Sequence, residues 1–290
     1  MSETHGVSVP GAPPMPWTLT GFADEAGPDL GEQIALFSDL GLRWLDLRSA
    51  WGTNVIAFDD DQVAKAKGAL DTAGIAVSSI ASPIGKIKLT DDFDAHLAKA
   101  ERAARLAHAF STPYVRMFSF FMPKGEDPDV HRDEVLRRMA AMVAVAEQFD
   151  VVFIHENEKG IYGDIPRRCL DIVDSIGSPN LRLVFDPANF VQCCVLPFDE
   201  ALEMVRPHLE YIHMKDAVMG SGDVRVAGEG DGQIREVIRA LHADGFTGFF
   251  SIEPHLGSFD AFGGQCGPEL WRTAHHGFVS LLDDEGVAYR

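Results

Sequence analysis

The sequence predicts a single (β/α)8 barrel, the TIM-barrel class of α/β fold, from three observations. Eight short runs of β-forming residues alternate with amphipathic helical patterns from Trp17 onward. The steps from one strand to the next are about 26–39 residues, the size of a βαβ unit. Several strands, such as VVFI and FFSI, are continuous apolar runs, as expected for strands buried on both faces.

The expected strands follow one another at this spacing along the whole chain. They are Thr18–Ala23, Trp44–Arg48, Ile75–Ala81, Tyr114–Phe120, Val151–Glu156, Leu181–Asp186, Tyr211–Lys215 and Gly248–Glu253. Eight βα units in series favour a closed parallel barrel with helices outside it.

The segments between the strands carry ordinary helix signals. Helices are expected from Pro28 to Gly41, from Asp59 to Gly74, and over 128–149, 165–177, 198–206, 232–245 and 267–283. Thr90 is expected to cap a further, Ala-rich helix with Asp91, Asp92 and Asp94 in its first turn, where the helix dipole favours anions.

The alternative architecture is a doubly wound open sheet. That fold usually carries a glycine-rich phosphate-binding turn after its first strand. Here the turn reads GFADEAGPDLG, and Asp24 and Glu25 stand where a phosphate would need bare N–H groups. The barrel is therefore favoured, as one catalytic domain over residues 17–290. Residues 1–16 are expected to form a flexible Pro/Gly-rich tail.

Composition and charge exclude several classes of protein. The chain has 290 residues, 46% of them hydrophobic and 24% charged, which are ordinary values for a globular domain. Its 44 acidic residues outnumber 25 Lys and Arg, so the formal net charge is −19. Nucleic-acid binding needs a basic footprint, and an anionic membrane surface would repel this chain. We therefore expect neither partner.

Cellular location is inferred from the absence of sorting signals. No run reaches the roughly 18 apolar residues of a membrane span, and the start of the chain lacks a secretory signal pattern. The four cysteines show no disulfide framework spacing. These features predict a cytoplasmic protein with reduced thiols.

Four consecutive strands each end with a potential metal ligand. They are Glu156, Asp186, His213 and Glu253, spaced by one βα unit each. The carboxyl ends of barrel strands meet at one face, so these side chains should converge on one point. Three carboxylates and one imidazole suit a hard or borderline dication. One divalent ion is expected: Mn²⁺ first, with Mg²⁺, Co²⁺ and Zn²⁺ as the other candidates.

The motifs around these residues carry a family resemblance. The Glu of HEN, the Asp of FDPAN, the His of HMKD and the Glu of IEP resemble those of xylose isomerase-like TIM barrels, in the sugar phosphate isomerase/epimerase group. The resemblance covers about residues 17–285. It implies one divalent metal on Glu156, Asp186, His213 and Glu253, acid/base roles for the two glutamates, and a homo-oligomer.

One position departs from that family pattern. Ketose 3-epimerases typically place a substrate-contacting His three residues after the strand-six Asp, where this chain has Asn189. Simple ketose 3-epimerisation is therefore less favoured than other reactions of the group.

Further polar and aromatic residues at the strand ends and in the loops after them are candidates for substrate binding. These are Glu158, Asn189, Lys215, Asp216, His255, Arg48, Arg116, Trp51 and Glu229. Arginines donate well to oxygen-rich ligands, and Trp51 could stack on a sugar face. Asp216 could also orient a neighbouring site residue. Each candidate has a structural alternative, such as a salt bridge or a loop hydrogen bond; for Lys215 and Asp216 it is a buried ion pair at the barrel rim. His155 should point to the opposite face of its strand from Glu156 and be structural.

The expected function is metal-dependent isomerisation or epimerisation of a sugar, keto-sugar or inosose. Glu156 and Glu253 would move protons α to a carbonyl, through an enediolate. The alternative is a metal-dependent dehydratase or lyase on a keto-sugar or inosose. More remote are an endonuclease IV-like phosphodiesterase and a non-catalytic sugar-binding barrel. The expected partner is a small polyhydroxylated carbonyl compound.

Overall fold

A computed structural model describes residues 15–260 and 263–290, and its centre is an eight-stranded parallel barrel. The barrel strands are β1 (Thr18–Gly21), β2 (Trp44–Leu47), β5 (Ala76–Ile80), β6 (Tyr114–Met117), β7 (Val152–Glu156), β8 (Leu181–Phe185), β9 (Leu209–Met214) and β12 (Phe249–Ile252). Their hydrogen-bonded order is β1-β12-β9-β8-β7-β6-β5-β2. The sequence prediction of a single (β/α)8 barrel is confirmed.

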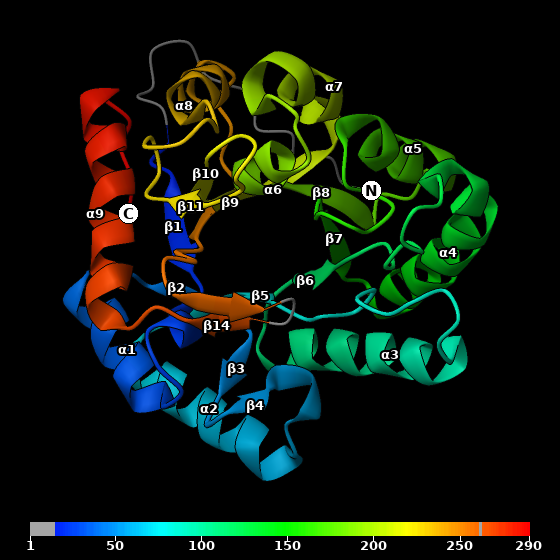
Figure 1. The fold of residues 1–290 in the computed structure, drawn as a ribbon. Coiled ribbons are helices and arrows are strands. Elements are labelled where there is room, and N and C mark those ends of the chain that lie inside the picture. Colours follow the sequence, from blue (N-terminus) through cyan, green and yellow to red (C-terminus); the bar gives the residue numbers. More distant parts are fainter. Residues whose placement is uncertain (1–14, 261–262) are drawn as a thin grey trace.

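Helices surround the strands in a ring, as Figure 1 shows. They are α1 (Leu30–Asp39), α2 (Asp60–Ala73), α3 (Phe93–Ala109), α4 (Arg132–Phe149), α5 (Pro166–Ile176), α6 (Pro187–Gln192), α7 (Glu203–Val205), α8 (Ile234–Ala243) and α9 (Pro268–Asp284). The main hydrophobic core lies between this ring and the barrel. Among the described residues, no helix combines the length and the apolar character that crossing a membrane would need.

Several predicted boundaries were wrong, each for a local reason. Thr90 does not cap α3: Asp92 does, and its side chain accepts a hydrogen bond from the Ala95 backbone N–H at 3.1 Å. The expected helix over 198–206 is a π-helical turn, Pro197–Leu202, followed by the short α7. The short helix α6 was not predicted. Residues 1–14 of the expected tail lie outside the described residues.

The barrel has a seam between β1 and β2, the two ends of the strand order. Among the described residues, no backbone pairing joins these two strands. Side chains cross the seam instead: Thr20 Oγ1 donates to Asp46 Oδ2 at 3.4 Å, and Arg48 Nε donates to Asp24 Oδ2 at 2.8 Å. The barrel is therefore closed here by polar side chains.

A hydroxyl network surrounds one buried carboxylate inside the barrel. Asp46 is 2% exposed. Its oxygens accept hydrogen bonds from Tyr211 at 2.9 and 3.0 Å, from Ser251 at 2.6 Å and from Ser79. Buried carboxylates need such partners to offset the loss of water. The barrel interior around Asp46 is therefore polar, with its carboxylate held by the hydroxyl groups of Ser79, Tyr211 and Ser251.

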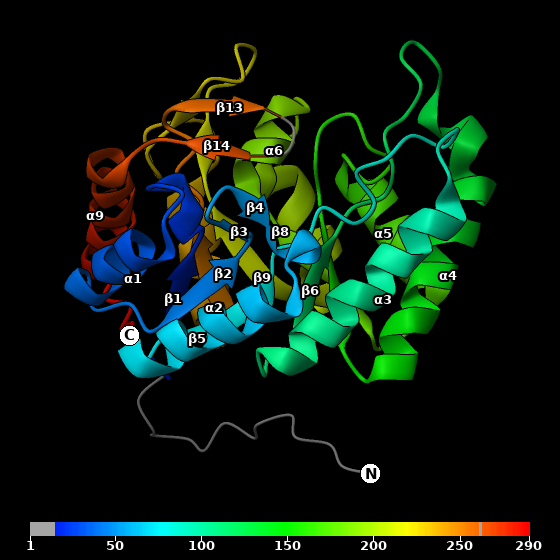
Figure 2. The same cartoon turned by 90° about the horizontal axis from the view of Figure 1, so that it is seen from below.

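Loops and short hairpins build up the end of the barrel where the strands finish. The hairpin strands are β3 (Ser49–Ala50), β4 (Thr53–Asn54), β10 (Asp216–Ala217), β11 (Val224–Arg225), β13 (Ser258–Asp260) and β14 (Gly263–Gln265). Figure 2 shows β13 and β14 lying above the barrel strands, on the same side as α6. This is the face where barrel chemistry is normally found.

The end of β1 fits closely against α9. A Cβ on Gly21 would lie 2.8 Å from both the Ile252 carbonyl oxygen and the Trp271 ring, so only glycine fits there. The Trp271 indole N–H donates to the Phe22 carbonyl at 3.0 Å. These contacts fix Phe22, whose fully buried side chain is part of the site described next.

Candidate active site

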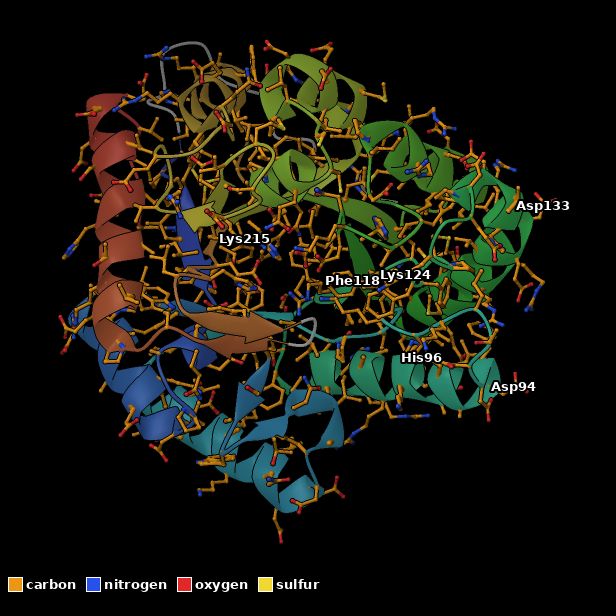
Figure 3. All side chains as sticks on the ribbon, viewed as in Figure 1. Asp94, His96, Phe118, Lys124, Asp133 and Lys215 are labelled. Atoms are coloured by element: carbon orange, nitrogen blue, oxygen red, sulfur yellow. The ribbon has the colours of Figure 1, made fainter. Side chains whose placement is uncertain are left out.

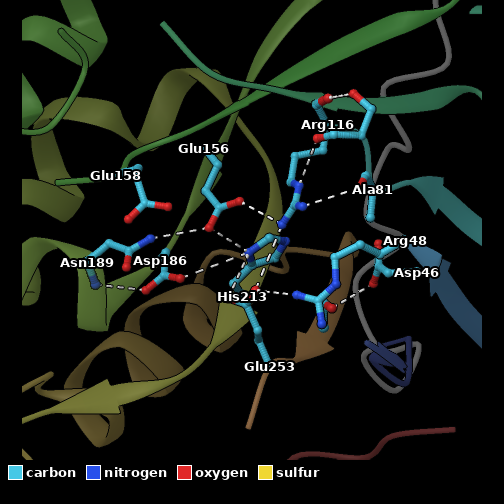
Figure 4. Close-up of polar contacts among 12 residues, drawn as sticks. Asp46, Arg48, Ala81, Arg116, Glu156, Glu158, Asp186, Asn189, His213 and Glu253 are labelled. Carbon is cyan, nitrogen blue, oxygen red and sulfur yellow. Dashed lines mark hydrogen bonds and ion pairs between the residues drawn. The ribbon is translucent and has the colours of Figure 1, made fainter. Parts of the chain in front are cut away.

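The four predicted ligand residues come together at the carboxyl ends of their strands. Glu156 ends β7, Asp186 follows β8, His213 lies near the end of β9 and Glu253 follows β12. Each is at most 3% exposed. One ligand atom from each lies within 4.8 Å of the others. Because the strands are parallel neighbours in the barrel, the sequence spacing of one βα unit becomes convergence in space (Figure 4).

His213 stands at the centre of the group. Its Nδ1 lies 3.3 Å from Glu156 Oε1, 3.8 Å from Glu253 Oε2 and 4.0 Å from Asp186 Oδ2. This buried nitrogen has no hydrogen-bond partner among the described residues. A buried polar atom normally has a partner, so Nδ1 is suited to an exogenous ligand.

The donor set fits a divalent cation. Three carboxylates and one imidazole within this space provide the oxygen-rich, mixed coordination that Mn²⁺ or Mg²⁺ prefers. Without compensation, three buried carboxylates would repel one another. Asp186 is divided between two tasks: its Oδ1 accepts the Asn189 N–H at 2.9 Å as the cap of α6, and its Oδ2 faces the centre.

Lys215 also points into the centre of the barrel, whereas Asp94 and Asp133 lie on the outer helices (Figure 3). The Lys215 Nζ is 2.9 Å from Asp186 Oδ2 and 2.8 Å from Glu253 Oε2. This places a cation directly against two of the four candidate ligands.

Two arginines, Arg48 and Arg116, approach from the side of the site opposite Asp186, as Figure 4 shows. Arg116 Nη1 lies 3.1 Å from Glu156 Oε2 and 3.8 Å from Glu253 Oε1, so it reaches both glutamates. Its other nitrogens donate to the Ala81 and Ser82 carbonyls at 3.2 and 3.4 Å. Arg116 is thus held by backbone groups on its own side and presents one nitrogen to the glutamates.

Asn189 occupies the position where a ketose 3-epimerase would have histidine. Its Nδ2 donates to Glu156 Oε1 at 3.2 Å and to the Asn157 carbonyl at 2.9 Å. It therefore orients a candidate catalytic carboxylate and also lines the cavity above the site.

The charges of the site shift the pKa of its members. Burial opposes ionisation of Glu156, but His213 and Arg116 outweigh it and lower its pKa to about 2. Burial is likewise outweighed at Glu253, where Lys215 and His255 hold the pKa well below its usual range. At Asp186 burial prevails over Lys215 and raises the pKa to about 6. The three carboxylates thus differ in how strongly their surroundings stabilise charge.

A cavity of about 840 Å³ opens above these residues. The predicted site residues that line it are Arg48, Arg116, Glu156, Glu158, Asn189, Lys215, Glu229, Glu253 and His255. This volume suits a small polar molecule.

Two predicted binding residues do not line the cavity. Trp51 packs on Phe58, with the two ring centroids 5.8 Å apart, and Lys65 Nζ lies 4.2 Å from the centroid of the Trp51 ring. Asp216 is buried, and its carboxylate accepts backbone N–H groups from Gly228 at 2.9 Å and Gly232 at 2.8 Å. Trp51 therefore has a packing environment. Asp216 anchors a loop through backbone N–H groups, which is not the buried ion pair expected as its structural alternative.

Three residues of the site were missed from the sequence. Lys86 lines the cavity, with Nζ 2.9 Å from Glu158 Oε2, and buried Phe22 and Phe118 lie beneath the cationic side chains. A basic residue in the loop after the third strand was the available signal for Lys86. The two phenylalanines resemble ordinary core residues, so nothing in the sequence marked them. His155, as expected, faces away from the site, and its Nε2 is 3.0 Å from Ser119 Oγ.

A second acidic and histidine group lies beside the first. It consists of Glu25, Glu253 and His255. The Glu25 carboxylate already accepts the His255 backbone N–H at 2.9 Å and lies 3.4 Å from Arg48 Nη2. Because a cation is already present there, this group is less suited to a metal ion than the first.

The fold and site define a (β/α)8 barrel with a buried carboxylate and histidine centre at the ends of its strands. The model of the xylose isomerase-like TIM barrel family matches residues 34–274. The chain belongs to this family.

Two curated relatives match shorter segments. A 3-dehydroshikimate dehydratase from Bacillus anthracis is 23% identical over 130 residues, or 45% of this chain and 46% of that protein. A 2-epi-5-epi-valiolone 7-phosphate 2-epimerase from an Actinoplanes strain is 31% identical over 99 residues, or 34% and 35%. The chain thus spans less than half the length of each relative, and both relatives are enzymes.

Solved structures match the whole barrel. A D-tagatose 3-epimerase-like protein has a TM-score of 0.76 at 16% identity, covering 93% of this chain and 100% of that one. A Mycobacterium smegmatis barrel in complex with magnesium has a TM-score of 0.63 at 20% identity, covering 92% and 97%. The IOLI protein with a zinc atom has a TM-score of 0.72 at 13% identity, covering 92% and 98%. The TM-scores and coverage show that these proteins share the fold of this chain.

Proposed function

We propose that this protein is a divalent-metal-dependent isomerase or epimerase of a sugar, keto-sugar or inosose. The observation that carries the proposal is the convergence of Glu156, Asp186, His213 and Glu253 beneath one polar cavity. Neither the family nor the fold alone would choose this chemistry, because one barrel fold supports many reactions.

The four converging side chains would hold the metal, with Mn²⁺ as the first candidate. A bound dication supplies Lewis-acid stabilisation of negative charge that develops on substrate oxygens. Related barrels solved with magnesium and with zinc support a metal of this charge. Asp186 and His213 do not line the cavity, so they would hold the ion without contacting the substrate.

Glu156 and Glu253 would carry the proton transfers. They come from β7 and β12, with β8 and β9 between them, so they reach the cavity from the two sides of the ligand group. One removes the proton α to the carbonyl and the other serves the neighbouring position, as general base and general acid. Return of the proton to the other face of the same carbon gives epimerisation. Its return to the next carbon gives isomerisation.

Arg116 and Asn189 would position Glu156 for this task. Each donates to a different oxygen of that carboxylate, at 3.1 and 3.2 Å, so its plane is fixed. Glu158, Glu229 and His255 line the cavity and would contact substrate hydroxyls.

Solvent deuterium uptake tests the proposal. The chelated protein is given Mn²⁺ in D₂O with a panel of ketoses, keto-sugars and inososes, and carbon-bound protons are followed by NMR. Loss of one proton signal that needs Mn²⁺ and disappears in Glu253→Gln supports enolisation, and the product separates isomerase from epimerase. With metal bound and no exchange on any compound, the acid/base assignment is rejected for that panel.

A dehydratase or lyase is the second candidate. The relative from Bacillus anthracis, a 3-dehydroshikimate dehydratase, favours it. The same residues would remove the α-proton, and loss of a β-hydroxyl would follow in place of proton return. An unsaturated product in the NMR experiment would identify this reaction.

A further inference from the structure

Three cations alternate with two aromatic rings along one side of the cavity. Arg48 Cζ lies 4.8 Å from the centroid of the Phe22 ring, and Arg116 Cζ lies 4.9 Å from the same ring. Arg116 Cζ is also 5.1 Å from the Phe118 centroid, and Lys86 Nζ lies 4.2 Å from that second ring. We call Arg48, Arg116 and Lys86 the cationic wall. Cation–π contacts of this kind hold the charged groups in fixed places.

Because of the cationic wall, basic residues make up a larger share of the charged residues around the cavity than of those in the whole chain. Across the chain, 44 acidic residues face 25 Lys and Arg. Among the described residues that line the cavity, the basic ones are Arg48, Lys86, Arg116, Lys159, Lys215 and Arg225. The acidic ones are Glu158, Asp223, Glu229 and the two candidate metal ligands Glu156 and Glu253, so six of these eleven charged residues are basic. The hydroxyl groups of a neutral sugar carry no charge, so they give no electrostatic reason for this concentration of cations.

Among the described residues, Arg48 has three carboxylate neighbours, and two of them, Asp24 and Glu25, do not line the cavity. Arg116 contacts Glu156 and Lys86 contacts Glu158, and both of these carboxylates line the cavity. Arg48 donates from Nε to Asp24 at 2.8 Å and from Nη2 to Glu25 at 3.4 Å, and neither carboxylate lines the cavity. Its Nη1 lies 3.7 Å from Glu253 Oε1, beyond hydrogen-bond distance, on the side of the reacting groups. Arg48 is thus held from behind and presents a donor forward.

We propose that the substrate of this site carries a negatively charged group, a carboxylate or a phosphate, bound by the cationic wall with Arg48 as the principal contact. The proposal rests on the proposed function and narrows its substrate class to acidic sugars, keto-sugars or cyclitols. A planar guanidinium held on two sides matches either anion through charge-assisted hydrogen bonds.

Matched ligands that differ in a single group test this. A hexose, its hexuronate and its 6-phosphate share the carbonyl end and differ only at carbon six, and several stereoisomeric sets are used in aldose and ketose form. Binding to the Mn²⁺-loaded protein is measured by calorimetry. We expect an acidic member of one set to bind at least tenfold more tightly than its neutral partner, with the advantage shrinking as salt is added. The tighter acidic member identifies carboxylate or phosphate.

Variants test the residues. Arg48→Gln should reduce the advantage to twofold or less, and Arg48→Lys, which keeps the charge, should leave part of it. Glu158→Gln removes a negative charge from the cavity and should increase the binding advantage of the acidic ligand. Lys67→Met, at a partly exposed position on α2, is the control for net charge and should change nothing. Circular dichroism establishes that each variant is folded.

The outcomes separate this inference from the proposed function. Equal binding of acidic and neutral ligands in every set overturns the inference, as does an advantage that survives in Arg48→Gln. If neutral sugars exchange deuterium in that case, the proposed function stands although the inference of an acidic substrate has failed. An acid preference that depends on Arg48, with no deuterium uptake, supports the inference and counts against enolisation.

Discussion

Lys215 and Glu253 form a buried ion pair, with Nζ 2.8 Å from Oε2, at the point where four strands deliver a candidate metal ligand. Replacing Lys215 by Met should lower the free energy of unfolding in EDTA by about 3 kcal/mol, because two carboxylates lose a buried cation. Mn²⁺ should then stabilise the variant more than it stabilises the original protein.

Urea unfolding with EDTA and with Mn²⁺ measures both effects. Lys67→Met removes an exposed lysine ion pair and should change stability by less than about 0.5 kcal/mol. Unchanged stability of Lys215→Met in EDTA would show that the ion pair contributes little.

Two substitutions of Asp186 should separate its role in metal binding from its role as the cap of α6. Asp186→Asn keeps an oxygen for the Asn189 N–H, whereas Asp186→Ala removes it. Both variants should bind Mn²⁺ at least tenfold more weakly in a calorimetric titration. In EDTA, the Ala variant should be about 1 kcal/mol less stable than the Asn variant, because it alone lacks the cap. Equal stability of the two would contradict a capping role.

Asp216 should control the shape of the cavity without touching the substrate. Its carboxylate accepts N–H groups from Gly228, Gly230 and Gly232, and the loop of these glycines contributes Glu229 to the cavity. Asp216→Ala should raise KM for the substrate identified by NMR at least tenfold, with a smaller effect on metal affinity. Faster proteolysis of residues 218–232 would locate the change. If KM and the rate of proteolysis are both unchanged in this variant, contacts other than those of Asp216 hold the loop in position.

His96 should make the fold acid-sensitive. Its Nε2 accepts the Gly85 N–H at 2.6 Å, which requires a neutral ring, and burial, with Lys99 and Arg138 nearby, lowers its pKa to about 4. The unfolded chain takes up this proton near its ordinary value of about 6.5. As the pH falls from about 6.5 to about 4, the unfolded state binds more protons, and stability is lost.

Melting temperatures from pH 7.5 to 4.5 in metal-free buffer test this. His96→Gln offers an acceptor that does not titrate there, so its curve should be flatter. His276→Gln, at an exposed position, should keep the original slope. Parallel curves for all three proteins would remove His96 as a cause.

The sequence predicted the barrel because each strand carries its own signal. All eight strands were found, and the spacing of Glu156, Asp186, His213 and Glu253 was sufficient to predict that they meet. The position of Thr90 misled because three acidic residues follow it, and only the backbone geometry shows that Asp92 is the cap.

The surroundings of the ligands were harder to predict, because they depend on contacts between distant loops. Trp51 and Asp216 follow strands just as the other candidates do, yet they pack against Phe58 and a glycine loop. Lys86 comes from a loop that Gly85 brings back toward Phe118, a contact between the loops after the neighbouring strands β5 and β6 that no local pattern reveals.

The seam between β1 and β2 has a consequence for motion. Side-chain hydrogen bonds such as Thr20 to Asp46 can break and reform without disturbing the parallel ladder elsewhere. The barrel should therefore breathe at this join, and amide hydrogens of β1 and β2 should exchange with solvent sooner than those of β7 and β8. Because Arg48 lies at the end of β2, the side of the cavity that it forms would widen and narrow with that breathing, while the ligand side stays still.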